Sequence, residues 1–462
     1  MRPFVVRPLL HLEGEISLSG DKSIAHRSII VSALSCGLTR IKNFPANKDC
    51  LSTVKAFKKL GIKIRQESTR RGLEVITVFG KGLRGLKKPK GPILVGDSGT
   101  TLRLLLGVLA GQNFQTKLVA GPSLSQRPML RVTKPLRMMG AKIKARVKKQ
   151  GSKIEEYPPI TIRGGNLKPI AYKMPVASAQ VKSAIILAAL YAKGKTYVTE
   201  RVRTRDHTER MLKLFRADIK VNPSTTLRVD GERSRTIKQN TIVIKGNKAL
   251  VSPGTVTIPG DISSAAFFII LATMIPGSKV LIRNVSLNPS RTGIIGVLKR
   301  MGADIKVSSV KCQLSKFEPM GDIIVKSSSL KGTIVKREEI PSLIDELPIL
   351  MVAACNARGR TVFEGVGELR IKETDRIRSL SSNLSKMGAD ITVSKAGSTE
   401  KIIIQGVKQL KAARVKSFGD HRTAMSIVVA GLAAVGKSRI DDISCINKSF
   451  PDFLSLLNTL KH

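Results

Sequence analysis

Lysine and arginine side chains recur along this chain next to hydroxyl groups and glycines, at places where helices are expected to begin. The N-terminus of a helix presents free N–H groups and a partial positive charge, and a cation beside it strengthens its attraction for anions. With 80 Lys and Arg among 462 residues, any single one could be an ordinary surface charge. Their repetition indicates a site for phosphate and carboxylate groups. The residues are Lys22, Arg27, Arg103, Arg127, Lys372, Arg376, His421, Arg422 and Lys448, beside Ser23, Ser98, Gly99, Thr100 and Ser178.

The segments that carry these residues belong to an internal repeat. One short phrase, of the type LKRMGADI, has a residue such as Met139, Met301 or Met387 before its glycine. It predicts the last turn of an amphipathic helix, a left-handed residue that ends the helix, and then a strand. The copy containing Arg216 lacks the glycine, so we expect its helix to end less cleanly. The copies have Leu60, Met139, Phe215, Met301 and Met387 at the same position.

A second phrase lies in register with the first: a polar residue in a turn, followed by small and apolar residues. Its copies start at Asp21, Asp97, Ser178, Asp261, Asp345 and Asp420. Successive starts are about 75 to 84 residues apart, which predicts six βαβ-type units. Because these helices are apolar nearly all round, they should be buried, with sheets outside them. If they run parallel, their positive ends collect at one end of each domain.

Three repeats per domain would give two α/β domains of similar size. The segment 252–260, rich in Pro and Gly, marks the crossing between them. The first strand, ending near Gly20, fits the second half. We therefore predict an N-terminal lobe of residues 21–258 and a C-terminal lobe of residues 1–20 and 259–462, with the active site in the cleft between them.

The net charge of +47 raises the question of a nucleic-acid partner. The basic residues are scattered along the whole chain, and four Tyr, thirteen Phe and no Trp leave few aromatic rings on which bases could stack. We therefore expect no specific nucleic-acid partner, although a basic RNA-binding or ribosome-associated protein stays open as an alternative. We interpret the surplus of basic residues as a proteome-wide or lineage bias in composition.

Five widely spaced cysteines without a CxxC pair signal neither a disulfide framework nor a zinc site. The first residues show no export signal, and no run of about 18 apolar residues indicates a membrane span. These features favour a cytoplasmic protein with no membrane partner.

Nine motifs in order along the chain resemble the 3-phosphoshikimate 1-carboxyvinyltransferase family, also called 5-enolpyruvylshikimate-3-phosphate synthases. They are DKSIAHR, GDSGTTLR, SQRPM, SAQVKSA, TRDHTERM, PSLIDELP, ELRIKETDRI, GDHRTAMS and INKSFPDF. The resemblance implies the enolpyruvyl transferase fold: two inside-out α/β domains, each of three repeats with buried parallel helices and outer sheets. It also implies transfer of the enolpyruvyl group of phosphoenolpyruvate to the 5-hydroxyl of shikimate 3-phosphate, a monomer, and no metal or organic cofactor.

The same resemblance implies the substrate contacts. Shikimate 3-phosphate would be held by Lys22, Ser23, Arg27, Ser178, Gln180, Thr204, Asp345 and Lys372. Phosphoenolpyruvate would be held by Lys22, Gly99, Arg127, Gln180, Arg376, Arg422 and Lys448. Gly99 lacks a Cβ beside the phosphoenolpyruvate pocket, so the inhibitor glyphosate should fit there and Gly99→Ala should crowd it.

The implied chemistry needs one proton delivered to the methylene carbon of phosphoenolpyruvate and another removed from the attacking hydroxyl. Two carboxylates in unlike surroundings can divide this work. Glu373, close to Arg376, is assigned as the carbon acid and Asp345 as the group that accepts the hydroxyl proton, with closure of the domains expected to precede chemistry. Lys22 and Glu346 compete for the same roles.

Two related families remain as alternatives. The enolpyruvyl transferase of peptidoglycan synthesis places a Cys in the loop corresponding to residues 121–129 and an Asn after its first-helix Lys. Here that loop has no Cys, and Ser23 follows Lys22. An RNA 3'-phosphate cyclase would need a catalytic His and nucleotide handling that the sequence does not place.

Overall fold

The computed structural model describes residues 3–68, 74–151, 153–223, 240–309, 317–396 and 399–460. The chain divides into two compact units. The unit that we call N-terminal consists of Lys22–Ile258 and Leu314–Phe317. The unit that we call C-terminal consists of Met1–Asp21, Pro259–Gln313 and Glu318–His462. Each unit has its own hydrophobic core.

The described part of the N-terminal unit contains three sheets, and each begins with a parallel pair followed by two antiparallel neighbours. Their orders are β14-β3-β5-β4, with β15 also paired to β3, then β6-β7-β9-β8 and β10-β11-β13-β12. The strands are β3 (Ser35–Lys42), β4 (Lys63–Ser68), β5 (Glu74–Lys81), β6 (Ile93–Gly96), β7 (Gln115–Ala120), β8 (Lys142–Gln150), β9 (Lys153–Arg163), β10 (Ala171–Lys173), β11 (Lys195–Glu200), β12 (Asp218–Pro223), β13 (Asn240–Lys245), β14 (Leu250–Val251) and β15 (Thr255–Thr257). One pattern of pairing is thus used three times.

In the described residues of the C-terminal unit, two sheets repeat this plan, and the third has three strands, with one antiparallel neighbour instead of two. Its sheets have the orders β17-β18-β16-β2, β19-β20-β22-β21 and β1-β24-β23. The strands are β1 (Phe4–Val6), β2 (Glu13–Ser17), β16 (Lys279–Ser286), β17 (Asp304–Ser309), β18 (Met320–Lys326), β19 (Ile334–Val335), β20 (Arg360–Glu364), β21 (Asp390–Ala396), β22 (Thr399–Gln405), β23 (Arg414–Val415) and β24 (Ser438–Ile440). The strand β2, from the start of the chain, pairs in parallel with β16.

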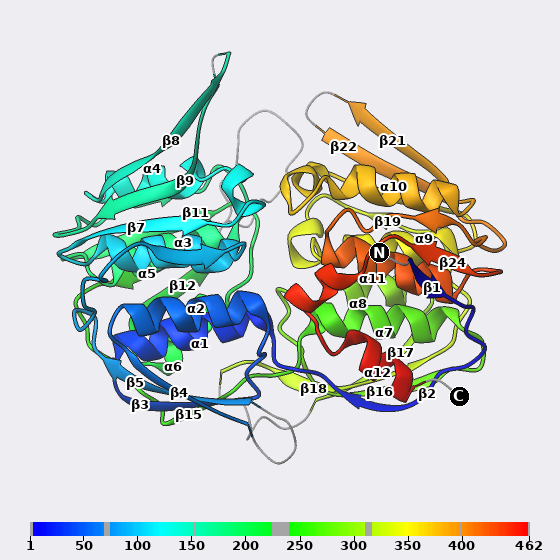
Figure 1. Ribbon diagram of the computed structural model, residues 1–462, viewed down its shortest axis with the longest axis horizontal. Coiled ribbons are helices and arrows are strands. Elements are labelled where there is room, and N and C mark those ends of the chain that lie inside the picture. The colour runs from blue at the N-terminus through cyan, green and yellow to red at the C-terminus, as the bar shows by residue number, and fades with distance from the viewer. Residues whose placement is uncertain are drawn as a thin grey trace. The chain divides into compact units, whose positions relative to one another are not determined.

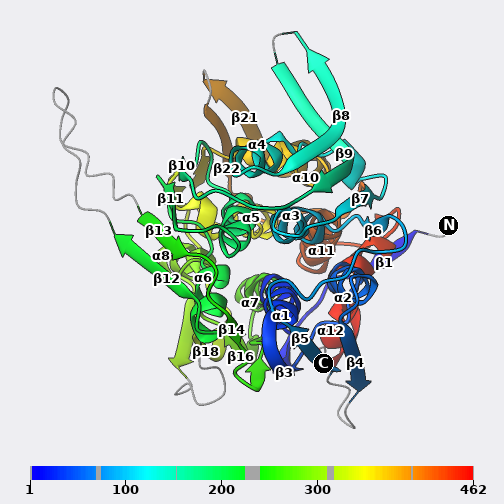
Figure 2. The ribbon, with the colours of Figure 1, turned by 90° about the vertical axis from the view of Figure 1, so that its left-hand side faces the viewer.

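Three helices in each unit lie inside its sheets, as the apolar phrases predict. They are α1 (Lys22–Leu34), α3 (Gly99–Ala110) and α5 (Ala179–Ala189), then α7 (Ile262–Met274), α9 (Leu347–Cys355) and α11 (His421–Leu432). Every residue of α9 and α11 is buried. Figure 1 shows the sheets outside these helices, and Figure 2 shows α1, α3 and α5 nearly end-on. A helix without a polar face can be stable only in such a place.

The remaining helices pack one face against these cores and leave the other face polar. They are α2 (Lys48–Lys59), α4 (Leu130–Met138), α6 (His207–Leu214), α8 (Gly293–Arg300), α10 (Arg376–Lys386) and α12 (Phe453–Thr459). Short 3-10 helices are η1 (Leu124–Gln126), η2 (Ile340–Ser342), η3 (Gly367–Ile371) and η4 (Ser444–Lys448). In α8 the buried side chains Ile294, Ile295, Val297 and Leu298 form the spacing of a one-sided helix.

The predicted helix endings have the left-handed residue at the expected place. Gly61 has φ +86° and its N–H donates to the carbonyl of Lys58 at 3.0 Å. The expectation for Arg216 was wrong: it adopts φ +62°, and its N–H donates to the carbonyl of Lys213 at 3.0 Å. Its helix therefore ends with the same cap. An arginine can take this conformation at a cost of about 1–2 kcal/mol, which the surrounding repeat tolerates.

Among the described residues, no helix is both long and apolar enough to cross a membrane. Cys36, Cys50, Cys355 and Cys445 are free thiols, and Cys312 lies outside the described residues.

Candidate active site

The buried helices of the N-terminal unit begin side by side. Near the start of α5, Gln180 accepts a hydrogen bond from Nη1 of Arg103 at 2.8 Å and donates one to the hydroxyl of Thr100 at 2.9 Å, both on α3. Arg27 on α1 donates to the hydroxyl of Ser183 on α5 at 2.8 Å. The free N–H groups of three helices therefore collect at one end of this unit, as predicted.

Lys22 and Arg27 lie one turn apart on α1 but have different surroundings. The side chain of Lys22 is 20% exposed, and its Nζ lies 3.0 Å from Oδ2 of Asp49 on α2. Arg27 is buried, and its guanidinium also donates to the hydroxyl of Thr208 and to the carbonyl of Ser23. Lys22 can thus reach a ligand without leaving its helix, whereas Arg27 orders the hydroxyl groups around it.

Gly99 is the first residue of α3, after the capping residue Ser98, and it lies against two guanidinium groups. A Cβ built on Gly99 would lie 2.7 Å from Nη1 of Arg103 and 3.1 Å from Nη1 of Arg127. The absence of a side chain therefore lets Arg103 and Arg127 approach the start of this helix. The sequence prediction placed Gly99 and Arg127 at one subsite, and the structure brings them together.

With the phosphoenolpyruvate subsite that the resemblance implies, we expect Gly99→Ala to raise the KM for phosphoenolpyruvate about tenfold, because the new methyl group displaces the ends of Arg103 and Arg127. Stability should change by less than about 1 kcal/mol, since alanine suits a helix and both guanidiniums end flexible side chains. Initial rates and thermal melting would measure the two effects. Gly296→Ala on α8, where a Cβ would meet nothing within 4 Å, is the control. An unchanged KM would contradict the placement of Gly99.

Ser178 and Thr204, the other predicted phosphate contacts, are both hydrogen-bonded. The hydroxyl of Ser178 caps α5 by accepting from the N–H of Val181 at 3.4 Å. Thr204 is buried, and its hydroxyl donates to Oε2 of Glu200 at 2.7 Å. The Thr204 hydroxyl is thus committed to a carboxylate within the protein.

The buried helices of the C-terminal unit also begin together. The hydroxyl of Ser263 on α7 donates to Glu346, the capping residue of α9. Nη1 of Arg422 on α11 donates to the carbonyl oxygen of Asp345 at 2.7 Å. Arg291 lies among these ends with 2% of its side chain exposed.

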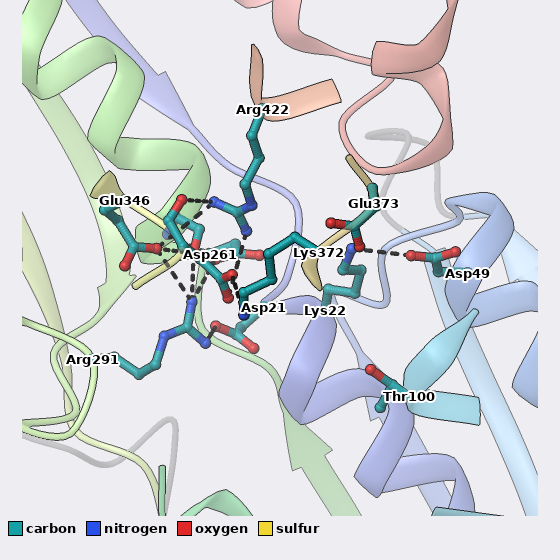
Figure 3. A network of polar contacts seen from close by, with 12 residues as sticks. Asp21, Lys22, Asp49, Thr100, Asp261, Arg291, Glu346, Lys372, Glu373 and Arg422 are labelled. Atoms are coloured by element: carbon teal, nitrogen blue, oxygen red, sulfur yellow. Dashed lines mark hydrogen bonds and ion pairs between the residues drawn. The ribbon is translucent and has the colours of Figure 1, made fainter. Parts of the chain in front are cut away.

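Three carboxylates surround Arg291. Its guanidinium lies 3.1 Å from Asp21, 3.5 Å from Asp261 and 3.9 Å from Glu346, and Figure 3 shows it pointing toward all three. Burial raises the pKa of Asp261, and the charge of Asp21 adds to this effect while Arg291 and Arg422 oppose it. Arg291 therefore neutralises acids that would otherwise repel an anion at the helix starts.

Asp345 is the carboxylate around which the predicted cations gather. Its Oδ1 lies 3.8 Å from Nζ of Lys372 and 3.6 Å from Nη1 of Arg376, and its Oδ2 lies 4.0 Å from Nη2 of Arg422. The Asp345 side chain is 18% exposed, whereas its neighbour Glu346 is fully buried. Asp345 can therefore meet a substrate, and three positive charges favour its ionised form.

Arg376 links the remaining acids of this cluster. It is 1% exposed, its Nε donates to Oδ2 of Asp420 at 2.9 Å, and its Nη2 donates to Glu373. The side chain of Glu373 is 34% exposed. Asp420 also caps α11 by accepting from the N–H groups of Arg422 and Thr423. Lys448, at the end of η4, is exposed.

The buried pair of Arg376 and Asp420 predicts a pH dependence of stability. Burial alone would raise the pKa of Asp420, but the Arg376 guanidinium outweighs it and holds the pKa below its usual 3.8. Because its pKa is lowered in the folded protein, Asp420 stabilises the fold at pH values above its pKa in the unfolded chain. This stabilisation is lost as the pH falls through its pKa in the folded protein.

We therefore expect Asp420→Asn to lower the free energy of unfolding by about 3 kcal/mol at neutral pH. The difference from the unaltered protein should shrink below about pH 4, where Asp420 of the unfolded chain becomes protonated while Asp420 of the folded protein still resists protonation. Urea unfolding at several pH values would measure it. A difference that stays constant down to about pH 3 would show that the charge of Asp420 is not what stabilises the fold.

Several residues of these networks were not among the predicted site residues. Asp49 forms an ion pair with Lys22, and Arg291 forms ion pairs with the three carboxylates described above. Lys182 forms ion pairs with both Glu200 and Glu209. Arg291 precedes α8, which is not one of the repeated apolar helices, and Lys182 lies in the first turn of α5 but is fully buried. Their signal is their partners, which lie far away in the sequence.

Comparison with known proteins identifies the family. The family model described as EPSP synthase (3-phosphoshikimate 1-carboxyvinyltransferase) matches residues 6–457. Proteins named 3-phosphoshikimate 1-carboxyvinyltransferase are 44% identical in Desulforamulus reducens, over 98% of each chain, and 45% identical in Petrotoga mobilis, over 99% of each.

Solved structures agree. EPSP synthase from Acinetobacter baumannii matches with a TM-score of 0.81 and 40% identity, covering 100% of this chain and 98% of that one. The enolpyruvyl transferase NikO from Streptomyces tendae, 14% identical with a TM-score of 0.72 over 99% of this chain and 97% of its own, shares the fold. The resemblance in the sequence motifs and the predicted enolpyruvyl transferase fold are thereby confirmed. The chain belongs to the EPSP synthase family, the 3-phosphoshikimate 1-carboxyvinyltransferases.

Proposed function

We propose that this protein transfers the enolpyruvyl group of phosphoenolpyruvate to the 5-hydroxyl of shikimate 3-phosphate and releases inorganic phosphate by addition and elimination. This is the step of the shikimate pathway that leads toward chorismate and the aromatic amino acids. The observation that carries the proposal is the group around Asp345: a partly exposed carboxylate with Lys372, Arg376 and Arg422 within 4.0 Å, at the starts of buried helices. Such a group offers both a base and binding partners for an anion.

The proposed binding contacts are the residues that the family resemblance implies. For shikimate 3-phosphate they are Lys22, Ser23, Arg27, Ser178, Gln180, Thr204, Asp345 and Lys372. For phosphoenolpyruvate they are Lys22, Gly99, Arg127, Gln180, Arg376, Arg422 and Lys448. Lys22 supports this assignment because its ammonium group is partly exposed and lies 3.0 Å from the carboxylate of Asp49, with which a phosphate could compete.

Asp345 is proposed to accept the proton of the attacking hydroxyl, because three cations favour its ionised form. Glu373 is proposed to deliver a proton to the methylene carbon of phosphoenolpyruvate. An anionic substrate competes with Glu373 for Arg376, and the added negative charge favours the protonated form of Glu373. As phosphate leaves, Glu373 would take a proton back from the methyl group and Asp345 would give its proton to the departing phosphate. Glu346 is a poorer candidate for either role since it is fully buried.

An assay of inorganic phosphate release tests the proposal. We expect release only when phosphoenolpyruvate and shikimate 3-phosphate are both present, with a rate that saturates in each. Correctly folded protein that releases no phosphate under these conditions would refute the proposed function. A cytoplasmic location and a monomeric state stay predictions, which cell fractionation and light scattering would check.

A further inference from the structure

Thr204 has one hydroxyl hydrogen and, on the proposed function, two acceptors for it. The hydroxyl donates to Oε2 of Glu200 at 2.7 Å, and the N–H of Thr204 donates to the same oxygen at 3.1 Å. Both residues are 3% exposed. An ionised carboxylate only accepts hydrogen bonds, so in the free protein Glu200 takes the hydrogen of Thr204.

A phosphate dianion is also an acceptor only. If shikimate 3-phosphate contacts the hydroxyl of Thr204, one hydrogen lies between two acceptors, Glu200 and the phosphate, and cannot serve both. Adding one proton removes the conflict: protonated Glu200 donates to the oxygen of Thr204, and Thr204 donates to the phosphate. The proton comes from solvent, and no other bond is formed or broken.

We propose that Glu200 is a positioning residue that takes up one proton when the phosphate of shikimate 3-phosphate binds, and thereby turns the hydroxyl of Thr204 toward the phosphate. This inference rests on the proposed function. Glu200 does not touch the reacting atoms. It acts through Thr204 and sets the affinity for the phosphate.

The charged groups around Glu200 make it the carboxylate that can take up this proton. From α5, Nζ of Lys182 lies 3.2 Å from Oε2 of Glu200, and from α6, Oε1 of Glu209 lies 2.7 Å from the same ammonium group. The carbonyl of Thr204 also accepts from Lys182, at 3.3 Å. Lys182 is fully buried, so one positive charge is shared by two buried carboxylates.

The balance of these charges favours protonation of Glu200. Burial already raises its pKa above the ordinary value, Lys182 and the Thr204 hydroxyl oppose this, and Glu209 adds to it. A phosphate dianion arriving at Thr204 adds further negative charge and raises the pKa again. The surroundings therefore lead to proton uptake on binding.

Calorimetric titration of shikimate 3-phosphate in two buffers of different ionisation enthalpy measures this uptake. At about pH 7.5 the phosphate, with its second pKa near 6, is mostly dianionic. We expect the protein to take up between about 0.5 and 1 proton per ligand, and the Kd to rise up to tenfold per pH unit above this pH. Glu200→Gln should take up almost none, and its Kd should lose this pH dependence.

Three further variants keep the test decisive. Thr204→Val removes the shared hydrogen and should take up less than half as many protons as the unaltered protein, even if Glu200→Gln fails to fold. Thr204→Ser keeps the hydroxyl and should retain the uptake. Glu364→Gln is the matched control, because Glu364 ends β20 as Glu200 ends β11 but pairs with Lys401 instead. It should behave like the unaltered protein.

Binding without proton uptake, or equal uptake by Glu200→Gln, would overturn the role of Glu200. In either case turnover of shikimate 3-phosphate with phosphoenolpyruvate would leave the proposed function standing. Failure of the unaltered, folded protein to bind shikimate 3-phosphate would overturn both, so the two failures are distinguishable.

Discussion

Arg376→Met is expected to lower the free energy of unfolding by about 3–5 kcal/mol and turnover by about 10²–10³. The stability falls because Asp420, which is fully buried, loses the guanidinium 2.9 Å away and is left without this counter-charge. Turnover falls because the same guanidinium contacts Glu373 and lies 3.6 Å from Asp345. Urea unfolding and initial rates measure the two losses.

Two other substitutions separate these effects. Arg376→Lys keeps the charge near Asp420 but loses the planar fork, so it should recover part of the stability and little of the turnover. Arg378→Met changes an exposed arginine on the same helix, α10, and should alter neither quantity appreciably. If Arg376→Met were as stable and as active as Arg378→Met, the buried ion pair would not have the role assigned to it.

Asp345→Asn is expected to reduce kcat by about 10²–10⁴, the usual effect of removing a general base. The KM for phosphoenolpyruvate should not rise, because the loss of one negative charge leaves Lys372, Arg376 and Arg422 freer to bind an anion. Steady-state kinetics with each substrate varied would show this split between kcat and KM.

Glu346→Gln tests the neighbouring acid as a rival base. Glu346 is fully buried and accepts a hydrogen bond from Ser263. Glu346→Gln should therefore lower the free energy of unfolding while leaving kcat nearly unchanged. Asp322→Asn is the acid-to-amide control, because Asp322 on β18 forms an ion pair with Arg283 on β16. A larger loss of kcat in Glu346→Gln than in Asp345→Asn would reverse the assignment.

The fold could be predicted from the sequence where the signal is local. The glycine of the repeated phrase marks the end of a helix because only a few residues adopt positive φ readily, and Gly61, Gly140, Gly302 and Gly388 do so. The burial of the helices without a polar face could also be predicted locally, because their own residues offer no side that suits water. Arg216 shows the limit: the repeat imposes its cap on a residue that does not prefer it.

The site could be predicted less completely, because charges act through space. The repeat placed Lys22, Arg376 and Arg422 at helix starts, but it did not show which carboxylates would form ion pairs with them. Arg291 pairs with Asp21, which is 270 residues away along the chain, and Arg27 bonds to Thr208, 181 residues away. Neither pairing leaves a periodic pattern. Which cations are available to a ligand, and which neutralise buried acids, follows only from the folded structure.

The most direct test of the central claim is phosphorus NMR of the complete reaction. We predict that the phosphoenolpyruvate signal is converted into inorganic phosphate, while an equal amount of shikimate 3-phosphate is converted into a new phosphate monoester. Release of phosphate with shikimate 3-phosphate unchanged would indicate simple hydrolysis. That result, or no conversion by folded protein, would contradict enolpyruvyl transfer.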